Sequence, residues 1–157
     1  MKLKDIGDLA NLIAGVGVIL SLLFVGYQIR QNTEETRAAN AAAVGQSFRE
    51  LVLTRAHSPS LAEAIATVNA GEDATRTQNS QYQAYFLALL RTVEDAYLQY
   101  REGRLDESQV RVRLAAASIY LRRQAGRERY EQLRTGEVFS EDFIQWLDEQ
   151  LAEQSRE

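Results

Sequence analysis

Hydrophobic and polar residues separate along this chain into one long apolar run near its start and a series of amphipathic patterns after it. The run, Leu9 to Ile29, holds twenty-one consecutive residues without a charged side chain. At about 1.5 Å per residue, a helix of this length covers about 31 Å, which matches the hydrocarbon core of a bilayer, about 30 Å thick. We therefore predict a transmembrane anchor over residues 1–30 and a soluble domain over residues 31–157.

A charged start followed by an apolar run is also typical of a signal peptide. Here the apolar run exceeds the h-region of about 7–15 residues and leads into Tyr27, Gln28, Ile29 and Arg30 instead of a small-x-small cleavage site. The pattern favours an anchor that is not cleaved.

Five small residues in and just before the run recur at steps of three and four, which places them on one stripe of a helix. They are Gly7, Ala10, Ala14, Gly17 and Ser21. Such a stripe lets two helix backbones approach closely in lipid, where packing drives association. We predict self-association or docking on a partner helix; the alternative is that Gly and Ala are simply common in spans.

The soluble part shows helical spacing throughout. No helix stop occurs before Ser58 and Pro59, so the first helix is expected to run past the membrane, with an apolar face from Ala41 to Arg55. Ser58 as N-cap, Pro59 at the first helical position and Gly71 past the end predict a short second helix. Residues 72–79 are the most loop-like stretch.

The clearest periodicity follows, from Tyr82 to Tyr100, and predicts a central helix ended by Gly103. Asp106 with Gln109 resembles a capping box for the next helix. Gly126 is expected to interrupt the helical pattern that follows. Ser140 is expected to cap a last helix. We predict an all-α protein: one N-terminal transmembrane helix followed by a small helical bundle of about five helices.

Charge limits the partners. The net charge of -4 argues against a nucleic-acid binder, since phosphate contacts need a cationic surface, and the absence of cysteine excludes disulfides and thiolate sites. Nine arginines lie between residues 101 and 134, and seven acids between residues 137 and 157. The acidic last helix is expected to lie along the basic helices before it; the alternative is a basic patch for lipid head groups.

Candidate chemistry is sparse. His57 is the one histidine and does not stand in a Glu-x-x-His motif, so a di-iron bundle site is excluded. Glu94 and Asp95 lie in the most apolar helical segment. We expect Asp95 to pair with Arg91 and Glu94 with Arg101; a structural role for Glu94 inside the bundle is the second interpretation and a general acid the third. We predict no enzyme, no cofactor and no metal, and place the tyrosines from Tyr82 to Tyr100 in the core and at its rim, with hydroxyls reaching the edge.

Three segments resemble known sequences. They are Gln28-Ile29-Arg30-Gln31-Asn32-Thr33 after the apolar run, Tyr97 to Asp106, and Phe139 to Phe143 before Trp146-Leu147-Asp148. On these segments the chain resembles an uncharacterised family of small bacterial single-span membrane proteins. The resemblance implies bacterial origin and this architecture, and it adds no catalytic residue.

The functional hypothesis is a non-enzymatic, membrane-anchored interaction module: an accessory subunit or oligomeric scaffold, with the lipid bilayer, further copies of itself or another membrane subunit as partners. The alternative is a sensor whose bundle binds a small or lipidic ligand among the tyrosines. We expect a single-pass protein of the bacterial inner membrane. Arg49 and Arg55, together with a short N-terminal tail that crosses readily, favour a cytoplasmic soluble domain.

Overall fold

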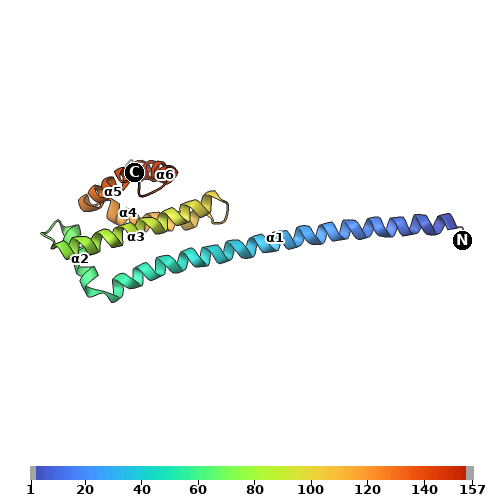
Figure 1. The fold of residues 1–157 in the computed structure, drawn as a ribbon, viewed down its shortest axis with the longest axis horizontal. Helices are drawn as coiled ribbons and strands as arrows, with labels where there is room; N and C mark the ends of the chain where they lie inside the picture. Colours follow the sequence, from blue (N-terminus) through green and yellow to red (C-terminus); the bar gives the residue numbers. More distant parts are fainter. Residues whose placement is uncertain (1–2, 155–157) are drawn as a thin grey trace. The chain divides into compact units, whose positions relative to one another are not determined.

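In a computed structural model of the chain, the backbone is described for residues 3–154 and the side chains for residues 14–154. Every regular element in the described part is an α-helix (Figure 1), which confirms the all-α prediction. The helices are α1 (Leu3–His57), α2 (Pro59–Ala70), α3 (Arg76–Arg101), α4 (Glu107–Leu121), α5 (Gln124–Thr135) and α6 (Glu141–Gln154). The chain divides into two compact units, residues 1–39 and residues 40–157.

The first unit consists of the first part of α1. Its polar end contains Asn32 and Thr33, which have low helix propensity, yet the helix continues through both residues. The hydroxyl of Thr33 donates to the carbonyl of Ile29 at 2.8 Å, and that of Thr36 to the carbonyl of Asn32 at 2.7 Å. Each hydroxyl therefore donates to a carbonyl in the preceding turn of the helix. It is then not available to stabilise a non-helical turn at this point of the chain. The prediction that the first helix ends only before Ser58 is confirmed.

Several helix ends follow local chemistry. The backbone N–H of Leu61 donates to the hydroxyl of Ser58 at 3.3 Å, and α2 ends at Gly71, whose φ of 74° a residue with a Cβ adopts only with strain. The expected loop over residues 72–79 is shorter in the structure, because Thr75 and Gln78 form a capping box that starts α3 at Arg76.

Two other predictions at helix ends are wrong. Asp106 is the N-cap of α4, but its side chain makes no capping bond; the N–H of Gln109 bonds the backbone carbonyl of Asp106 instead. Gly126 does not interrupt a helix but lies buried in the first turn of α5. A Cβ on Gly126 would lie 2.1 Å from the carbonyl oxygen of Tyr120, so this position is glycine because α5 packs directly on the end of α4.

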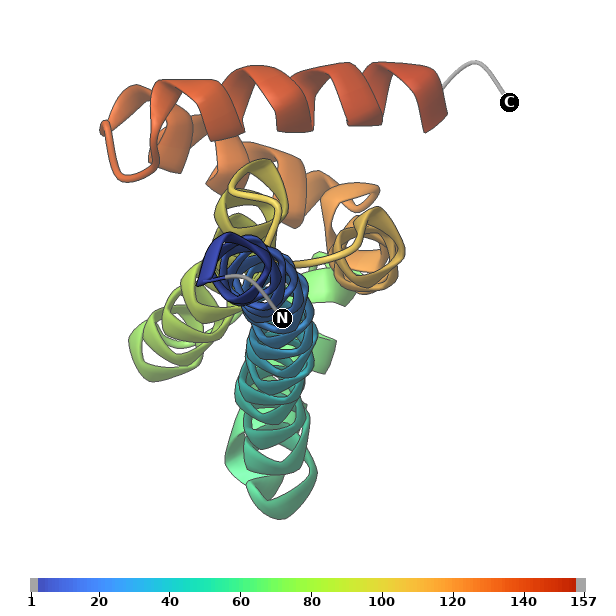
Figure 2. The same ribbon diagram turned by 90° about the vertical axis from the view of Figure 1, so that its right-hand side faces the viewer.

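The core of the second unit is built around α3. The backbones of α2 and α4 lie closest to α3, and α6 crosses it in the end-on view of Figure 2. Phe86, Leu90 and Val93 of α3 are completely buried, as are Phe143 and Leu147 of α6. The tyrosines at the ends of this core, including Tyr82 and Tyr97, are buried as predicted.

The close contact at Gly126 gives a stability prediction. Replacing Gly126 by Ala should lower the free energy of unfolding by about 2–4 kcal/mol, because the new methyl group overlaps the Tyr120 carbonyl and the α4–α5 corner must open. Denaturant unfolding, followed by the fluorescence of the single tryptophan, Trp146, measures this change.

Gly45→Ala is the matched control. Gly45 is also helical, but the atom nearest to the position of an added methyl group is Nη2 of Arg113 at 3.9 Å, an ordinary contact. This variant should be neutral or slightly more stable, since alanine favours a helix by up to about 1 kcal/mol over glycine. Equal effects of the two substitutions would contradict the close-packing argument.

Candidate membrane and interaction surfaces

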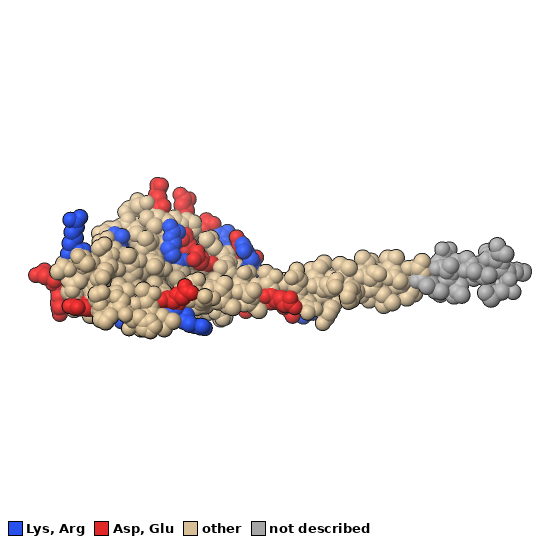
Figure 3. Space-filling model, turned by 60° about the horizontal axis from the view of Figure 1, so that its bottom comes forward, with Lys and Arg blue, Asp and Glu red and all other residues tan. Residues whose placement is uncertain are grey.

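Residues 14–29 of α1 form an apolar surface that is exposed within the described part of the chain. Side chains here are exposed throughout; Leu22 and Leu23 are each 66 % exposed and Phe24 is 60 % exposed. No Asp, Glu, Lys or Arg falls in this stretch, which appears in Figure 3 without blue or red side chains. By length and composition, α1 is the one candidate membrane span among the described residues, and none of its apolar window is buried.

The predicted packing stripe is described in part. Gly7 and Ala10 lie outside the residues with described side chains, whereas Ala14, Gly17 and Ser21 are exposed on α1. The hydroxyl of Ser21 donates to the carbonyl of Gly17 at 2.8 Å, so this polar group is satisfied within the helix. A Cβ on Gly17 would meet no atom within 4 Å. The structure thus leaves the stripe open, and its role in association stays a prediction.

Polar pairs begin where the apolar surface ends. Arg30 lies 3.2 Å from the carboxylate of Glu34, and the amide of Gln31 donates to Glu35 at 3.0 Å. Both pairs join exposed residues one helical turn apart, a spacing that stabilises a helix by about 0.2–0.5 kcal/mol per pair in water. Arg30 is therefore the first charged residue after the apolar surface of residues 14–29.

Glu94, the candidate acid, and Arg91 together join α3 to the segment that precedes α6; we call this pair of side chains the clasp. The side chain of Glu94 is buried, with 4 % exposed. One carboxylate oxygen accepts from the N–H of Ser140 at 2.9 Å and from its hydroxyl at 3.2 Å, and the other accepts from Arg91. The expected Arg91–Asp95 and Glu94–Arg101 pairs are therefore wrong, since Arg91 pairs with Glu94 and Arg101 pairs with Asp142 of α6.

Arg91 extends the clasp beyond α3. Its second terminal nitrogen donates to the carbonyl of Val138 at 2.7 Å, and its guanidinium lies 4.8 Å from the centre of the Phe139 ring. Both groups of the pair thus hold the segment that leads into α6. Both oxygens of Glu94 are engaged in this way, so the carboxylate fits its structural interpretation.

The tyrosines pack and bond with one another. The Tyr85 and Tyr120 hydroxyls are 3.4 Å apart, and Arg55 of α1 donates to Tyr120 at 2.6 Å. Burial raises the pKa of Tyr82 to about 12, and burial with the bond to Tyr120 raises the pKa of Tyr85 further. Both phenols are therefore neutral at physiological pH and serve the core. His57 is exposed at the end of α1.

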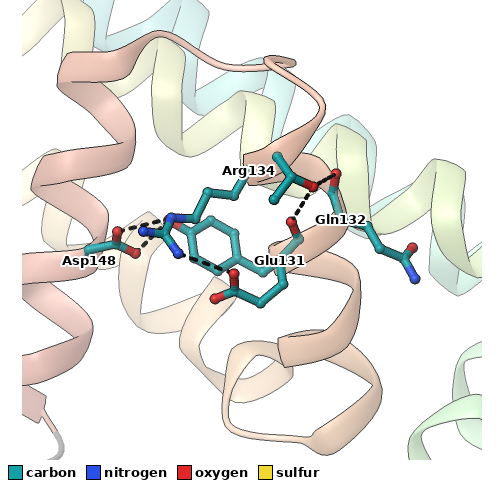
Figure 4. A network of polar contacts seen from close by, with 6 residues as sticks. Glu131, Gln132, Arg134 and Asp148 are labelled. Atoms are coloured by element: carbon teal, nitrogen blue, oxygen red, sulfur yellow. Dashed lines mark hydrogen bonds and ion pairs between the residues drawn. The ribbon is translucent and has the colours of Figure 1, made fainter.

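A second polar network joins α5 to α6 (Figure 4). Arg134 lies between two carboxylates, 3.1 Å from Glu131 and 3.4 Å from Asp148 of α6. Tyr130 donates to Asp148 at 2.9 Å, and burial together with this bond raises the pKa of the phenol. With the Arg101–Asp142 pair, these contacts agree with the prediction that the acidic last helix lies along the basic helices.

Three other arginines cluster where α4 meets α5; we call Arg122, Arg123 and Arg127 the basic corner. Their side chains are exposed, and across residues 14–154 none of the three has a carboxylate within ion-pair distance. The guanidinium of Arg127 donates to the Arg122 carbonyl at 2.9 Å. The tight contact at Gly126 holds the two helix ends together and thereby gathers these charges.

Cavities in the second unit are small or open. One of about 240 Å³ adjoins the basic corner, and its lining includes Arg122, Arg127, Tyr130 and Leu151. A wider depression of about 740 Å³ runs along the start of α6 and is lined mainly by acidic and polar residues, with Phe139 and Ile144. Within the described residues, no group of three or more His, Cys, Asp or Glu side chains is placed to hold a metal ion.

Comparison with known proteins adds no relative: no protein-family model, no curated protein and no solved structure matches this chain. The resemblance to small bacterial single-span membrane proteins therefore stays a prediction.

The clasp gives a second stability prediction. Glu94→Gln keeps the shape of the side chain but turns an NH₂ group toward either Arg91 or Ser140, which are both donors, and removes the charge that compensates Arg91. We expect the free energy of unfolding to fall by about 1–3 kcal/mol, the range for a buried group that loses its hydrogen-bond partners, because Glu94 is buried while Arg91 is half-exposed and stays hydrated. Denaturant unfolding of the full chain measures it.

Asp95→Asn is the control, one residue along the same helix. Burial, with the nearby Glu94 charge as a second cause, raises the pKa of Asp95, so its ionised form costs stability at neutral pH and its neutralisation should not destabilise the fold. A loss below about 1 kcal/mol for Glu94→Gln, or an equal loss for both variants, would show that the clasp is not a main contributor.

Proposed function

We propose that this protein is a membrane-anchored, non-enzymatic interaction module of the bacterial inner membrane, an accessory subunit or scaffold whose helical bundle meets partners outside the bilayer. The observation that carries the proposal is the uncovered apolar surface of residues 14–29. Transfer of one exposed Leu or Phe side chain out of water is worth about 1.5–3 kcal/mol, so a run of such residues strongly favours a lipid environment.

Two features support an interaction role for the bundle. Its most distinctive acid, Glu94, is occupied by structural bonds. Its basic corner, in contrast, presents cations that its own carboxylates leave uncompensated within the described chain. An acidic surface on a partner protein would supply the missing charges.

The basic corner lies far along the bundle from residue 40, where the chain enters this unit. Tyr120 bonds Arg55, near the end of α1, whereas the chain enters this unit at residue 40. At about 1.5 Å per residue, fifteen residues of helix separate Arg55 from the entry by about 22 Å. The corner thus lies at the end of the bundle remote from its entry point.

Orientation rests on the distribution of positive charge. Lys2 and Lys4 precede the apolar run, and Arg30 and Arg37 follow it, so the nearest charges balance. The further arginines at 49 and 55 favour a cytoplasmic bundle.

Alkaline carbonate extraction tests the anchor. The full-length protein should stay with the membrane pellet and float with lipid in a density gradient, because residues 14–29 are held by hydrocarbon and not by charge. A variant that lacks residues 1–30 should be soluble and helical, and is the matched control. Release of the full-length protein by carbonate would instead identify α1 as the core helix of a soluble assembly and overturn the proposal.

Assembly through the small-residue stripe is the second part of the proposal. Gly17 and Ser21 are exposed on α1, and a Cβ on Gly17 would meet no atom of the described residues within 4 Å. We expect a homo-oligomer, or a fixed place beside the span of another subunit. Replacing Gly17 and Ser21 together by Leu should dissociate it, because the added side chains force the two backbones apart; crosslinking and sedimentation in detergent measure the change.

Leu20→Ala with Leu23→Ala is a control that alters size elsewhere in the same stretch and should keep the oligomer. If the wild type is monomeric at every protein concentration and the Gly17→Leu, Ser21→Leu variant behaves identically, the small residues of the stripe do not mediate association and the prediction is wrong.

A further inference from the structure

The last part of α1, residues 40–57, belongs to the second unit but packs weakly against the rest of it; we call this contact the seam. Val44 is its one buried apolar residue; Ala41, Phe48 and Leu51 are only half-buried against the core. The helix pairs with the closest backbone approach in this unit, such as α2 with α3, do not include α1. Burial of apolar surface is the main force that holds helices together, so α1 contributes and receives little of it.

The seam also contains polar atoms without partners. The described residues have four buried side-chain polar atoms without a hydrogen bond, and three of them belong to residues along α1 and the surfaces it meets: Asn40 Nδ2, Gln99 Oε1 and Arg113 Nε. A small cavity of about 110 Å³ lies between α1 and α3, lined by residues that include Val44, Asp95 and Gln99. An unsatisfied buried polar group costs about 1–3 kcal/mol, a cost that hydration would remove.

Arg113 is the most costly group. Its side chain is buried, with 3 % exposed, and the described chain brings no carboxylate into ion-pair contact with it. Its guanidinium donates to the carbonyl of Gln109 at 2.5 Å and lies 6.0 Å from the centre of the Phe48 ring of α1. Desolvation lowers its pKa. A buried charge without a counter-ion opposes the closed state in which α1 covers it.

From these three observations we propose that residues 40–57 of α1 form a releasable strap, which opens from α3 and α4 while the rest of the bundle stays folded, and that the buried charge of Arg113 sets how often it opens. Opening hydrates the guanidinium, Asn40 and Gln99 together. It also exposes to water the surface of α3 and α4 beneath Val44 and Phe48.

Thiol labelling tests this, because the chain contains no cysteine of its own. Two reporters are made in the full-length protein in lipid nanodiscs: Val44→Cys in the seam, and Leu147→Cys in α6, where the native side chain is completely buried. Maleimide should label the thiol at position 44 at least tenfold faster than the thiol at position 147. Equal rates would mean that the seam is reached only by global unfolding, and the strap would be ruled out.

The second arm tests the role of Arg113 in the background of the Val44→Cys reporter. Arg113→Met fills the same space without a charge and should slow labelling at position 44 by about tenfold, and Asn40→Leu, which removes another unpartnered group, should slow it independently. Arg111→Met is the matched control, since Arg111 is exposed, pairs with Glu107 at 2.7 Å and should leave the rate unchanged. If Arg113→Met and Asn40→Leu both behave like Arg111→Met, polar frustration does not drive opening and the proposal fails.

Discussion

The buried carboxylate of Glu94 is the interaction on which the C-terminal half of the bundle depends. Its two oxygens accept from Ser140 and from Arg91, and Arg91 in turn bonds the Val138 carbonyl. A single residue of α3 thus determines where the chain enters α6. Once that entry is set, Phe143 and Trp146 reach Tyr97, with ring centres 5.8 Å and 4.7 Å apart, and the aromatic cluster closes this side of the core.

The arginines of this protein show how far environment decides the role of one residue type. Arg91 and Arg134 each lie next to carboxylates and link neighbouring elements. Arg113 is buried without such a partner, and the basic corner is exposed without one in the described chain. Arg91 and Arg134 stabilise the bundle. The buried charge of Arg113 opposes the packing of residues 40–57 on the bundle. The basic corner leaves positive charge available to another molecule.

Residues 14–29 and the bundle differ in where their apolar side chains lie. Residues 14–29 satisfy their backbone groups within one helix and expose mainly apolar side chains, which suits hydrocarbon and not water. Residues 40–157 bury a core of their own, with α3 as its centre. The weak seam along α1 belongs to this second unit, where apolar burial is concentrated between α3 and its other neighbours.

Sequence alone determined the helices, because apolar periodicity and capping residues are local signals. The apolar run from Leu9, the end of α1 before Ser58, the αL position of Gly71 and the tyrosine face of α3 could all be read this way. Tertiary structure decided what depends on residues distant in the chain. Arg91 has Glu94 and Asp95 both within helical reach, and only the approach of Ser140 selects Glu94. Gly126 lies near Tyr120 in the chain, but it is a packing glycine only because α5 folds back onto the end of α4. Pairings of this kind, and the uncompensated burial of Arg113 beneath Phe48, arise when separate helices meet, so no local pattern encodes them.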